Sequence, residues 1–149
     1  MIRCATKSDI LDIIKLEQEA FKKSLGKDFL TQEINDNPLA KYYVLEKNKQ
    51  IIGYIGFRLD ENKAEMMNFV VSSKFQNQGY GKKLLENALN DLIHLGAKSM
   101  ILEVRESNHG AKHVYESLGF KPRYIRKKYY ENEDAIVYIK EVSYENISC

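Results

Sequence analysis

The chain has 149 residues, of which 44% are hydrophobic and 30% are charged, and its formal net charge is +2. This length and composition suit a globular protein, so we expect a single domain over residues 1–149. No apolar run approaches the ~20 residues that a membrane-spanning helix needs, and the N-terminus lacks the apolar core of a signal peptide. We therefore expect a cytoplasmic protein without a membrane partner, and so small a net charge gives no reason to expect direct nucleic-acid binding.

The cysteines and histidines predict no metal site. Cys4 and Cys149 lie at opposite ends of the chain and match no metal-ligand spacing. Cys4 falls in an apolar opening run, which predicts a small buried side chain. His109 and His113 are four residues apart on a predicted helix, but the sequence offers no evident third ligand.

The N-terminal part of the chain predicts a short strand followed by two helices. The strand is expected over residues 1–5, and Thr6 with Asp9 resembles a capping pair at the start of the first helix. Apolar residues then recur at near-helical spacing as far as Phe21. A second, short helix is expected over residues 29–35.

The next part of the chain predicts three consecutive strands. Residues 42–46 and 51–59 flank a polar turn, as in a hairpin, and a third strand is expected over residues 64–71. Gly53 and Gly56 lie inside the second of these strands, which predicts a bulge or a close neighbour.

The remaining elements alternate between helix and strand. A glycine-containing loop leads into a helix that Gly96 is well placed to end. After it we expect a strand over residues 100–104, a helix over 110–118, and strands over 120–130 and 135–142. This order predicts one mixed α/β layer system. Because a helix joins the strand at 64–71 to the strand at 100–104, those two strands are expected to be parallel neighbours.

The loop Gln76-Asn77-Gln78-Gly79-Tyr80-Gly81 is the first segment that indicates chemistry. A helix N-terminus presents backbone N–H groups that lack intrahelical partners, and glycine lets a phosphate approach the backbone closely. Lys82 and Lys83 follow, which suits an anionic ligand. The loop therefore predicts an anion site with room for a pyrophosphate, although its glycines could equally serve an ordinary turn. Its spacing is that of neither a Rossmann nor a Walker loop.

Glu103 and Tyr115 are the candidate proton-transfer residues. Glu103 interrupts an apolar strand, where a carboxylate is costly unless it is paired or solvated. Burial would suit it to act as a general base for an amine, whereas an outward-pointing or lysine-paired carboxylate would have no such role. Tyr115 lies on the apolar face of a predicted helix and could be a core residue or a proton donor to a ligand.

Together these segments resemble the GNAT superfamily of N-acetyltransferases across nearly the whole chain. Gln76, Gly79 and Gly81 match its pyrophosphate loop, Q/R-x-x-G-x-G/A. Six further segments are similar, in this order, to the RimI branch of the superfamily. They are Asn68-Phe69-Val70-Val71, Leu102-Glu103-Val104-Arg105, Ser107-Asn108, and residues 115–120, 126–130 and 133–136. The resemblance implies a mixed, mostly antiparallel twisted sheet that is splayed between its fourth and fifth strands and flanked by about four helices.

The resemblance also implies acetyl-CoA as the co-substrate, without a metal. The pantetheine arm would enter the gap between the splayed strands, and the loop amides would hold the pyrophosphate. The implied cofactor-binding residues are Phe69, Val70, Val71, Gln76, Asn77, Gln78, Gly79, Tyr80, Gly81, Lys82 and Asn108. Glu103 would take the proton of the incoming ammonium, and Tyr115 would return a proton to the CoA thiolate. The amine would attack the thioester directly in a ternary complex.

RimI enzymes acetylate the N-terminal alanine of a ribosomal protein, so the expected acceptor is the α-amine of a protein N-terminus, with a ribosomal protein as one candidate. The alternatives are a small-molecule amine or a lysine side chain as the acceptor, or a CoA-binding module without catalysis. We expect a monomer or a weak homodimer.

One departure from the family bears on the acceptor. The chain has no tryptophan, whereas family members often carry one in the region that residues 25–28 occupy. The basic, tyrosine-rich segment at residues 121–130 could be a charged edge strand, a nucleic-acid patch or a wall of the peptide groove.

Overall fold

The structure is a computed structural model that describes residues 1–21, 24–130 and 132–142. Its strands form one sheet in the order β1-β2-β3-β4-β5-β7-β6. Neighbouring strands are antiparallel except β4 and β5, which are parallel, as the intervening helix predicted. None of the described helices is long and apolar enough to cross a membrane.

The order of the elements is the predicted one. The strands are β1 (Ile2–Cys4), β2 (Ala40–Lys47), β3 (Gln50–Asp60), β4 (Lys63–Val71), β5 (Ser99–Arg105), β6 (Lys121–Tyr130) and β7 (Glu133–Glu141). The α-helices are α1 (Ile10–Phe21), α2 (Lys27–Thr31), α3 (Tyr80–His94) and α4 (His109–Ser117). Short 3-10 turns lie at Lys7–Asp9 and Ser73–Phe75. The second predicted helix is divided between α2 and a π-helical turn at Gln32–Asp36.

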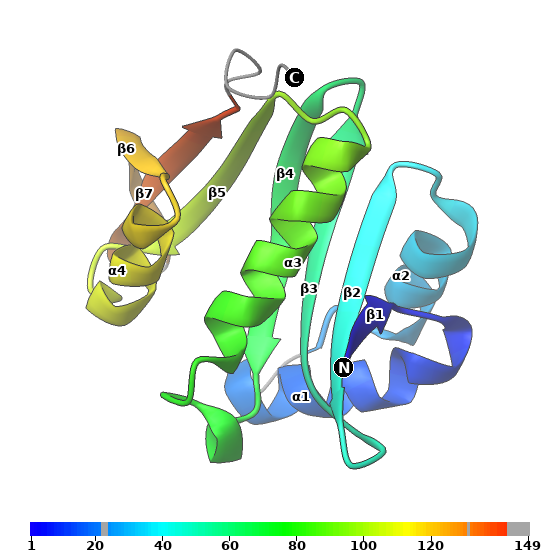
Figure 1. The fold of residues 1–149 in the computed structure, drawn as a ribbon. Coiled ribbons are helices and arrows are strands. Elements are labelled where there is room, and N and C mark those ends of the chain that lie inside the picture. The colour runs from blue at the N-terminus through cyan, green and yellow to red at the C-terminus, as the bar shows by residue number, and fades with distance from the viewer. Residues whose placement is uncertain (22–23, 131, 143–149) are drawn as a thin grey trace.

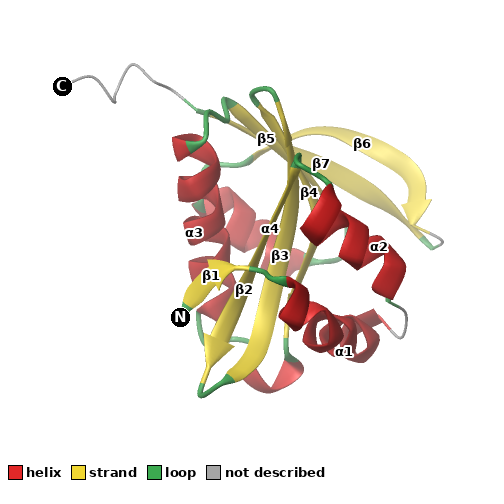
Figure 2. Cartoon of the chain, turned by 90° about the vertical axis from the view of Figure 1, so that its right-hand side faces the viewer, coloured by secondary structure: helices red, strands yellow, loops and turns green. Residues whose placement is uncertain are grey.

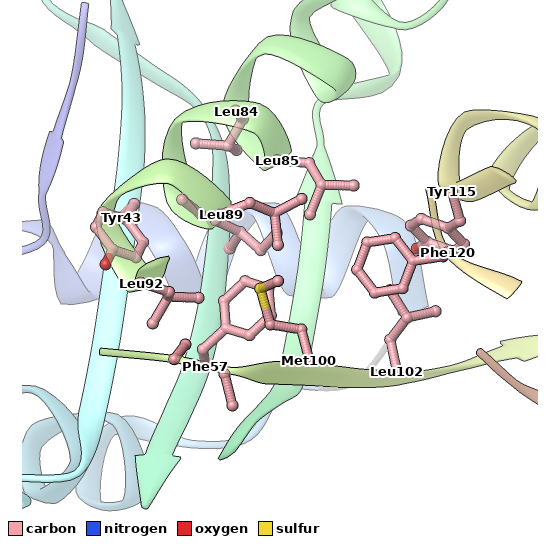
Figure 3. Packing of buried hydrophobic residues seen from close by; sticks show 14 of the residues in the cluster. Tyr43, Phe57, Leu84, Leu85, Leu89, Leu92, Met100, Leu102, Tyr115 and Phe120 are labelled. Carbon is pink, nitrogen blue, oxygen red and sulfur yellow. The ribbon is translucent and has the colours of Figure 1, made fainter. Parts of the chain in front are cut away.

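Helices cover both faces of the sheet. Figures 1 and 2 show α3 and α4 against one face and α1 and α2 against the other. Each face has its own hydrophobic core. On the α3 face, the leucines of α3 point onto Phe57 and Met100 of the sheet (Figure 3). The buried α3 residues, which share one side of the helix, are Leu84, Leu85, Ala88, Leu89 and Leu92. Each leucine contributes about 1.5–3 kcal/mol by its burial.

Strands β4 and β5 pair over only three residues and then separate. Lys63–Glu65 of β4 lies opposite Ser99–Ile101 of β5, and no later pair joins the two strands. Figure 1 shows the gap widening toward the end at which α3 and α4 begin. The predicted splay between the fourth and fifth strands is therefore confirmed, and it leaves one edge of β4 without a strand partner beyond Glu65.

A bulge in β4 lies beside this gap. Phe57 is opposite Met66 and Gly56 is opposite Asn68, so Met67 is an extra residue on β4. A Cβ atom on Gly56 would lie 2.4 Å from the ring of Tyr42, which explains the glycine. The bulge and the close neighbour predicted at this position are both confirmed. The extra residue of the bulge lies on β4 and not on the glycine-containing strand β3.

The predicted capping pair and helix end are also confirmed. The Thr6 backbone N–H donates to the Asp9 carboxylate at 2.8 Å. Arg3 donates two hydrogen bonds to the same carboxylate, and this contact holds the pKa of Asp9 below its usual range. Gly96 follows α3 with a φ of +105°, as its expected C′ position requires.

The prediction for Cys4 was wrong, because its side chain is exposed. Cys4 is the last residue of β1, and β1 is an edge strand of three residues, so little of the sheet covers it. Cys149 lies outside the described residues.

Candidate active site

Two cavities meet in the gap between β4 and β5. The strand cavity has a volume of about 480 Å³ and is lined by both strands, by Phe21 of α1 and by the end of β6. The loop cavity has a volume of about 410 Å³ and is lined by the loop before α3 and by α4. Phe69, Asn108 and Tyr115 line both cavities, so a molecule in one can contact a molecule in the other.

The alternation of side chains along β5 determines which residues face each cavity. Leu102 and Val104 are buried in the core on the α3 face. Ile101, Glu103 and Arg105 therefore point to the opposite face, where α1 lies, and all three line the strand cavity. The sequence thus places a carboxylate on one face of the sheet and an apolar core on the other.

The Met67 bulge determines which β4 side chains face each cavity. Because of the extra residue, both Glu65 and Asn68 lie on the α1 face, although their separation is an odd number of residues. Asn68 contacts Glu17 of α1 with its side chain, which confirms this direction. Phe69 packs against the core on the α3 face. The strand therefore contributes polar groups to the strand cavity and an aromatic ring to the loop cavity.

The loop cavity ends at the N-terminus of α3. Gly79 is the N-cap residue, with a φ of +85°, and the first intrahelical bond runs from the Lys83 N–H to the Gly79 carbonyl. The amides of Tyr80, Gly81 and Lys82 precede that bond, and such amides favour an anion together with the helix dipole.

Most of the predicted cofactor-binding residues line the loop cavity. These are Phe69, Val71, Gln76, Asn77, Gly79, Gly81, Lys82 and Asn108. Three others direct their side chains elsewhere. Val70 is buried in the core beneath α1, the Gln78 amide donates to the Lys74 carbonyl, and the Tyr80 hydroxyl accepts a hydrogen bond from Lys47. The prediction for these three concerns only their backbone groups, and it stays a prediction.

Asn108 has a structural role as well as a place in both cavities. It is the N-cap residue of α4, and its Oδ1 accepts the Ala111 N–H at 3.1 Å. Its side chain is therefore fixed at the point where the two cavities meet.

Glu103 is paired with a cation from the edge strand. Its side chain is 18% exposed, and its Oε1 lies 2.9 Å from a guanidinium nitrogen of Arg126 on β6. A hydrogen bond to Glu103 raises the pKa of Tyr129. The sequence left open whether this carboxylate is buried alone or paired, and the structure pairs it with an arginine rather than a lysine.

Tyr115 is almost fully buried, with 5% of its surface exposed. Its ring packs against Phe120 and Tyr138 at centroid distances of 6.0 and 6.2 Å. Burial raises the pKa of Tyr115, so its hydroxyl keeps its proton well above neutral pH. The interpretation of Tyr115 as a core residue is confirmed. Tyr115 also lines both cavities, and its role as a proton donor stays a prediction.

Other lining residues were not predicted from the sequence. Phe21, Glu65, Met66, Met67 and Ile101 line the strand cavity, and no motif marked them. The sequence did offer residues 121–130 as a possible wall of the peptide groove. Tyr129 and Tyr130, at the end of that segment, line this cavity. The rest of β6 is an exposed edge strand, which agrees with the simplest interpretation of its charge.

Comparisons with known proteins agree with this geometry. The Acetyltransferase (GNAT) family model matches residues 10–120. A [ribosomal protein bS18]-alanine N-acetyltransferase of Haemophilus ducreyi is 35% identical over 136 residues, which are 90% of this chain and 91% of that protein. The crystal structure of the ribosomal-protein-S18-alanine N-acetyltransferase from Escherichia coli superposes with a TM-score of 0.89 at 28% identity, covering 96% of this chain and 94% of that chain.

A more distant structure has the same fold. The PaiA N-acetyltransferase from Thermoplasma acidophilum, solved in complex with coenzyme A, has a TM-score of 0.81 at 21% identity, with 95% of this chain and 98% of that chain covered. The splayed sheet, the loop before α3 and the family match lead to one conclusion. The chain belongs to the GNAT family of acetyltransferases.

Proposed function

We propose that the protein transfers the acetyl group of acetyl-CoA to the α-amine of a protein N-terminus. The main support for this proposal is that the two cavities meet at Tyr115. Glu103 lines only the strand cavity, on the face of the sheet opposite the α3 core. Relatives named for the alanine of ribosomal protein bS18 support the acceptor class and make a ribosomal protein the first candidate. Such an acceptor would place the reaction in the cytoplasm.

The loop cavity is the proposed site for acetyl-CoA. The pyrophosphate would accept hydrogen bonds from the amides between Asn77 and Lys82 at the start of α3. The free edge of β4 at Phe69–Val71 would pair with the amides of the pantetheine arm, as an added strand would. The thioester would then lie in the gap, beside Asn108 and Tyr115. No metal has a role in this scheme.

The strand cavity is the proposed site for the acceptor. An N-terminal ammonium would lie near Glu103, which takes its proton and leaves a neutral amine. The amine nitrogen forms a bond to the thioester carbonyl carbon, and the carbon–sulfur bond breaks. The CoA thiolate then receives a proton from Tyr115, whose pKa is raised by burial. The nitrogen releases its second proton to solvent as it becomes an amide, and the Tyr115 oxygen takes up a proton from solvent, which restores its hydroxyl. No covalent enzyme intermediate is formed.

Acetyl transfer to a short peptide that begins with alanine tests this proposal. The peptide contains one internal lysine and is compared with the same peptide whose α-amine is already blocked. We expect transfer to the free peptide only. Equal transfer to both peptides would make a lysine side chain the acceptor. Binding of acetyl-CoA without transfer to either peptide would contradict the proposed acceptor and favour a small amine or a non-catalytic module.

A further inference from the structure

The strand cavity contains one carboxylate that the proposed reaction does not use. Three charged side chains line this cavity, those of Glu65, Glu103 and Arg105. Glu103 is paired with Arg126 at 2.9 Å, and Arg105 lies 3.9 Å from Glu133. Glu65 is exposed and has no ion pair among the residues that the structure describes.

The cation opposite Glu65 on β3 is already paired with another carboxylate. Arg58 lies opposite Glu65 in the register of β3 and β4. Its guanidinium is 2.9 Å from the buried carboxylate of Glu33, on the side of α2. Arg58 attracts Glu65 electrostatically but forms no ion pair with it, so Glu65 presents a carboxylate to the cavity that is free to pair with a bound cation.

The sheet register fixes the position of Glu65 relative to Glu103. Glu65 lies opposite Ile101, and Glu103 is two residues further along β5 on the same face. The two positions are thus about 7 Å apart along the strand direction. An extended peptide advances by about 3.3–3.6 Å per residue, so this separation corresponds to roughly two residues.

We propose that Glu65 is a specificity-determining residue that favours acceptors with a lysine or arginine at the second or third position. This inference rests on the proposed function, because it requires the acceptor ammonium to lie near Glu103. A cationic side chain from either position would reach Glu65 while the α-amine is at Glu103. An acidic side chain there would be repelled, and the preference would weaken as salt screens the charges.

The test uses peptides that differ only at the second and third residues. Arginine, alanine or glutamate is placed at each position in turn, and KM for the peptide is measured with saturating acetyl-CoA. The wild-type protein should show a KM about fivefold lower for the best arginine peptide than for the alanine peptide, as expected for a partly exposed ion pair. Raising the salt concentration to about 0.5 M should reduce this ratio.

Variants at Glu65 decide whether this side chain is responsible. Glu65→Gln should bring the arginine-to-alanine KM ratio close to one, and Glu65→Lys should favour the glutamate peptide. Glu86→Gln is the matched control, because Glu86 is an exposed glutamate on α3 that lines neither cavity. It should keep the wild-type ratio.

The possible failures are distinguishable. If the wild-type protein acetylates the peptides at the α-amine but Glu65→Gln and Glu65→Lys retain the wild-type KM ratio, the inference about Glu65 is overturned and the proposed function stands. If no peptide is acetylated although acetyl-CoA binds, the proposed function is overturned and the inference is overturned with it.

Discussion

Asn68 donates a hydrogen bond of 3.1 Å from its side-chain amide to the buried carboxylate of Glu17. The same oxygen of Glu17 accepts the Tyr54 hydroxyl at 2.7 Å, and the other oxygen accepts the Ser24 hydroxyl and the Leu25 N–H. Glu17 is 1% exposed, whereas Asn68 lines the strand cavity. A core carboxylate on α1 therefore holds both the segment after α1 and one wall of the proposed acceptor site.

Glu17→Gln should destabilise the fold and weaken acceptor binding. Each oxygen of Glu17 accepts two donors, so the glutamine NH₂ group would face donors in either orientation. We expect a loss of about 1–3 kcal/mol in the free energy of unfolding and a several-fold rise in KM for the peptide. Denaturant unfolding and steady-state kinetics measure the two effects.

Glu33→Gln is the matched control for this prediction. Glu33 is also buried, at 3% exposure, and accepts hydrogen bonds from Tyr42, Arg58 and Asn37, but it lines neither the strand cavity nor the loop cavity. It should lose a similar amount of stability without a comparable change in KM for a peptide with alanine at its second and third positions, which makes no ion pair with Glu65. Equal changes in KM for both variants would show that Glu17 acts only through stability.

Gly79→Ala should weaken acetyl-CoA binding. Gly79 has a φ of +85° at the N-cap of α3, and a Cβ there would meet nothing within 4 Å, so the cost is backbone strain of about 1–2 kcal/mol. Gly96, at the other end of the same helix, has a φ of +105° and equally open space. Gly96→Ala should cost comparable stability and leave the Kd of acetyl-CoA unchanged. A calorimetric titration that finds the same Kd for both variants would argue against the α3 N-terminus as the pyrophosphate site.

Tyr115→Phe should lower kcat with little loss of stability. The ring contacts with Phe120 and Tyr138 are kept, and the structure shows no hydrogen bond from the Tyr115 hydroxyl to the described residues. Loss of a general acid is expected to reduce kcat by about 10²-fold or more. Tyr138→Phe removes a hydroxyl from a neighbouring buried tyrosine that lines neither cavity, and it should retain kcat. An unchanged kcat in Tyr115→Phe would exclude it as the proton donor.

Buried tyrosines should make the fold sensitive to alkaline pH. Burial is the main cause that raises the pKa of Tyr42, Tyr43, Tyr54 and Tyr115 in the folded state. Because the folded state binds these protons more tightly, their contribution to stability is complete below the unfolded pKa of about 10 and is lost as the pH rises above it. The free energy of unfolding should therefore fall between about pH 10 and pH 11.5, and less steeply in Tyr115→Phe. A constant free energy over that range would contradict the effect.

Local patterns in the sequence predicted the parts of the fold that depend on near neighbours. The spacing of Leu84, Leu85 and Leu89 is enough to predict α3 and the side of it that is buried. Glycines at Gly79 and Gly96 mark its two ends because both positions have positive φ values. Glu103 stood out as the one carboxylate inside an apolar strand, but the sequence left open whether it is buried, solvated or paired.

The features that the sequence did not predict depend on contacts between distant segments. The Arg126–Glu103 pair requires β7 to lie beside β5 and β6 to lie beside β7, which no local pattern specifies. Met67 is an extra residue only with respect to the pairing of β4 with β3. Because of it, Glu65 and Asn68 lie on the same face of the sheet. Glu65 consequently had no feature in the sequence to distinguish it from other exposed glutamates.

Acetyl transfer as proposed above depends on Glu103, which takes the proton of an N-terminal ammonium in the strand cavity. The most direct measurement is kcat for Glu103→Gln with saturating acetyl-CoA and an alanine-initiated peptide, beside the Kd of acetyl-CoA for the same variant. We expect kcat to fall by about 10²–10⁴-fold while the Kd for acetyl-CoA stays at the wild-type value. A wild-type kcat in Glu103→Gln would contradict this role for Glu103, since another group would then have to accept the proton.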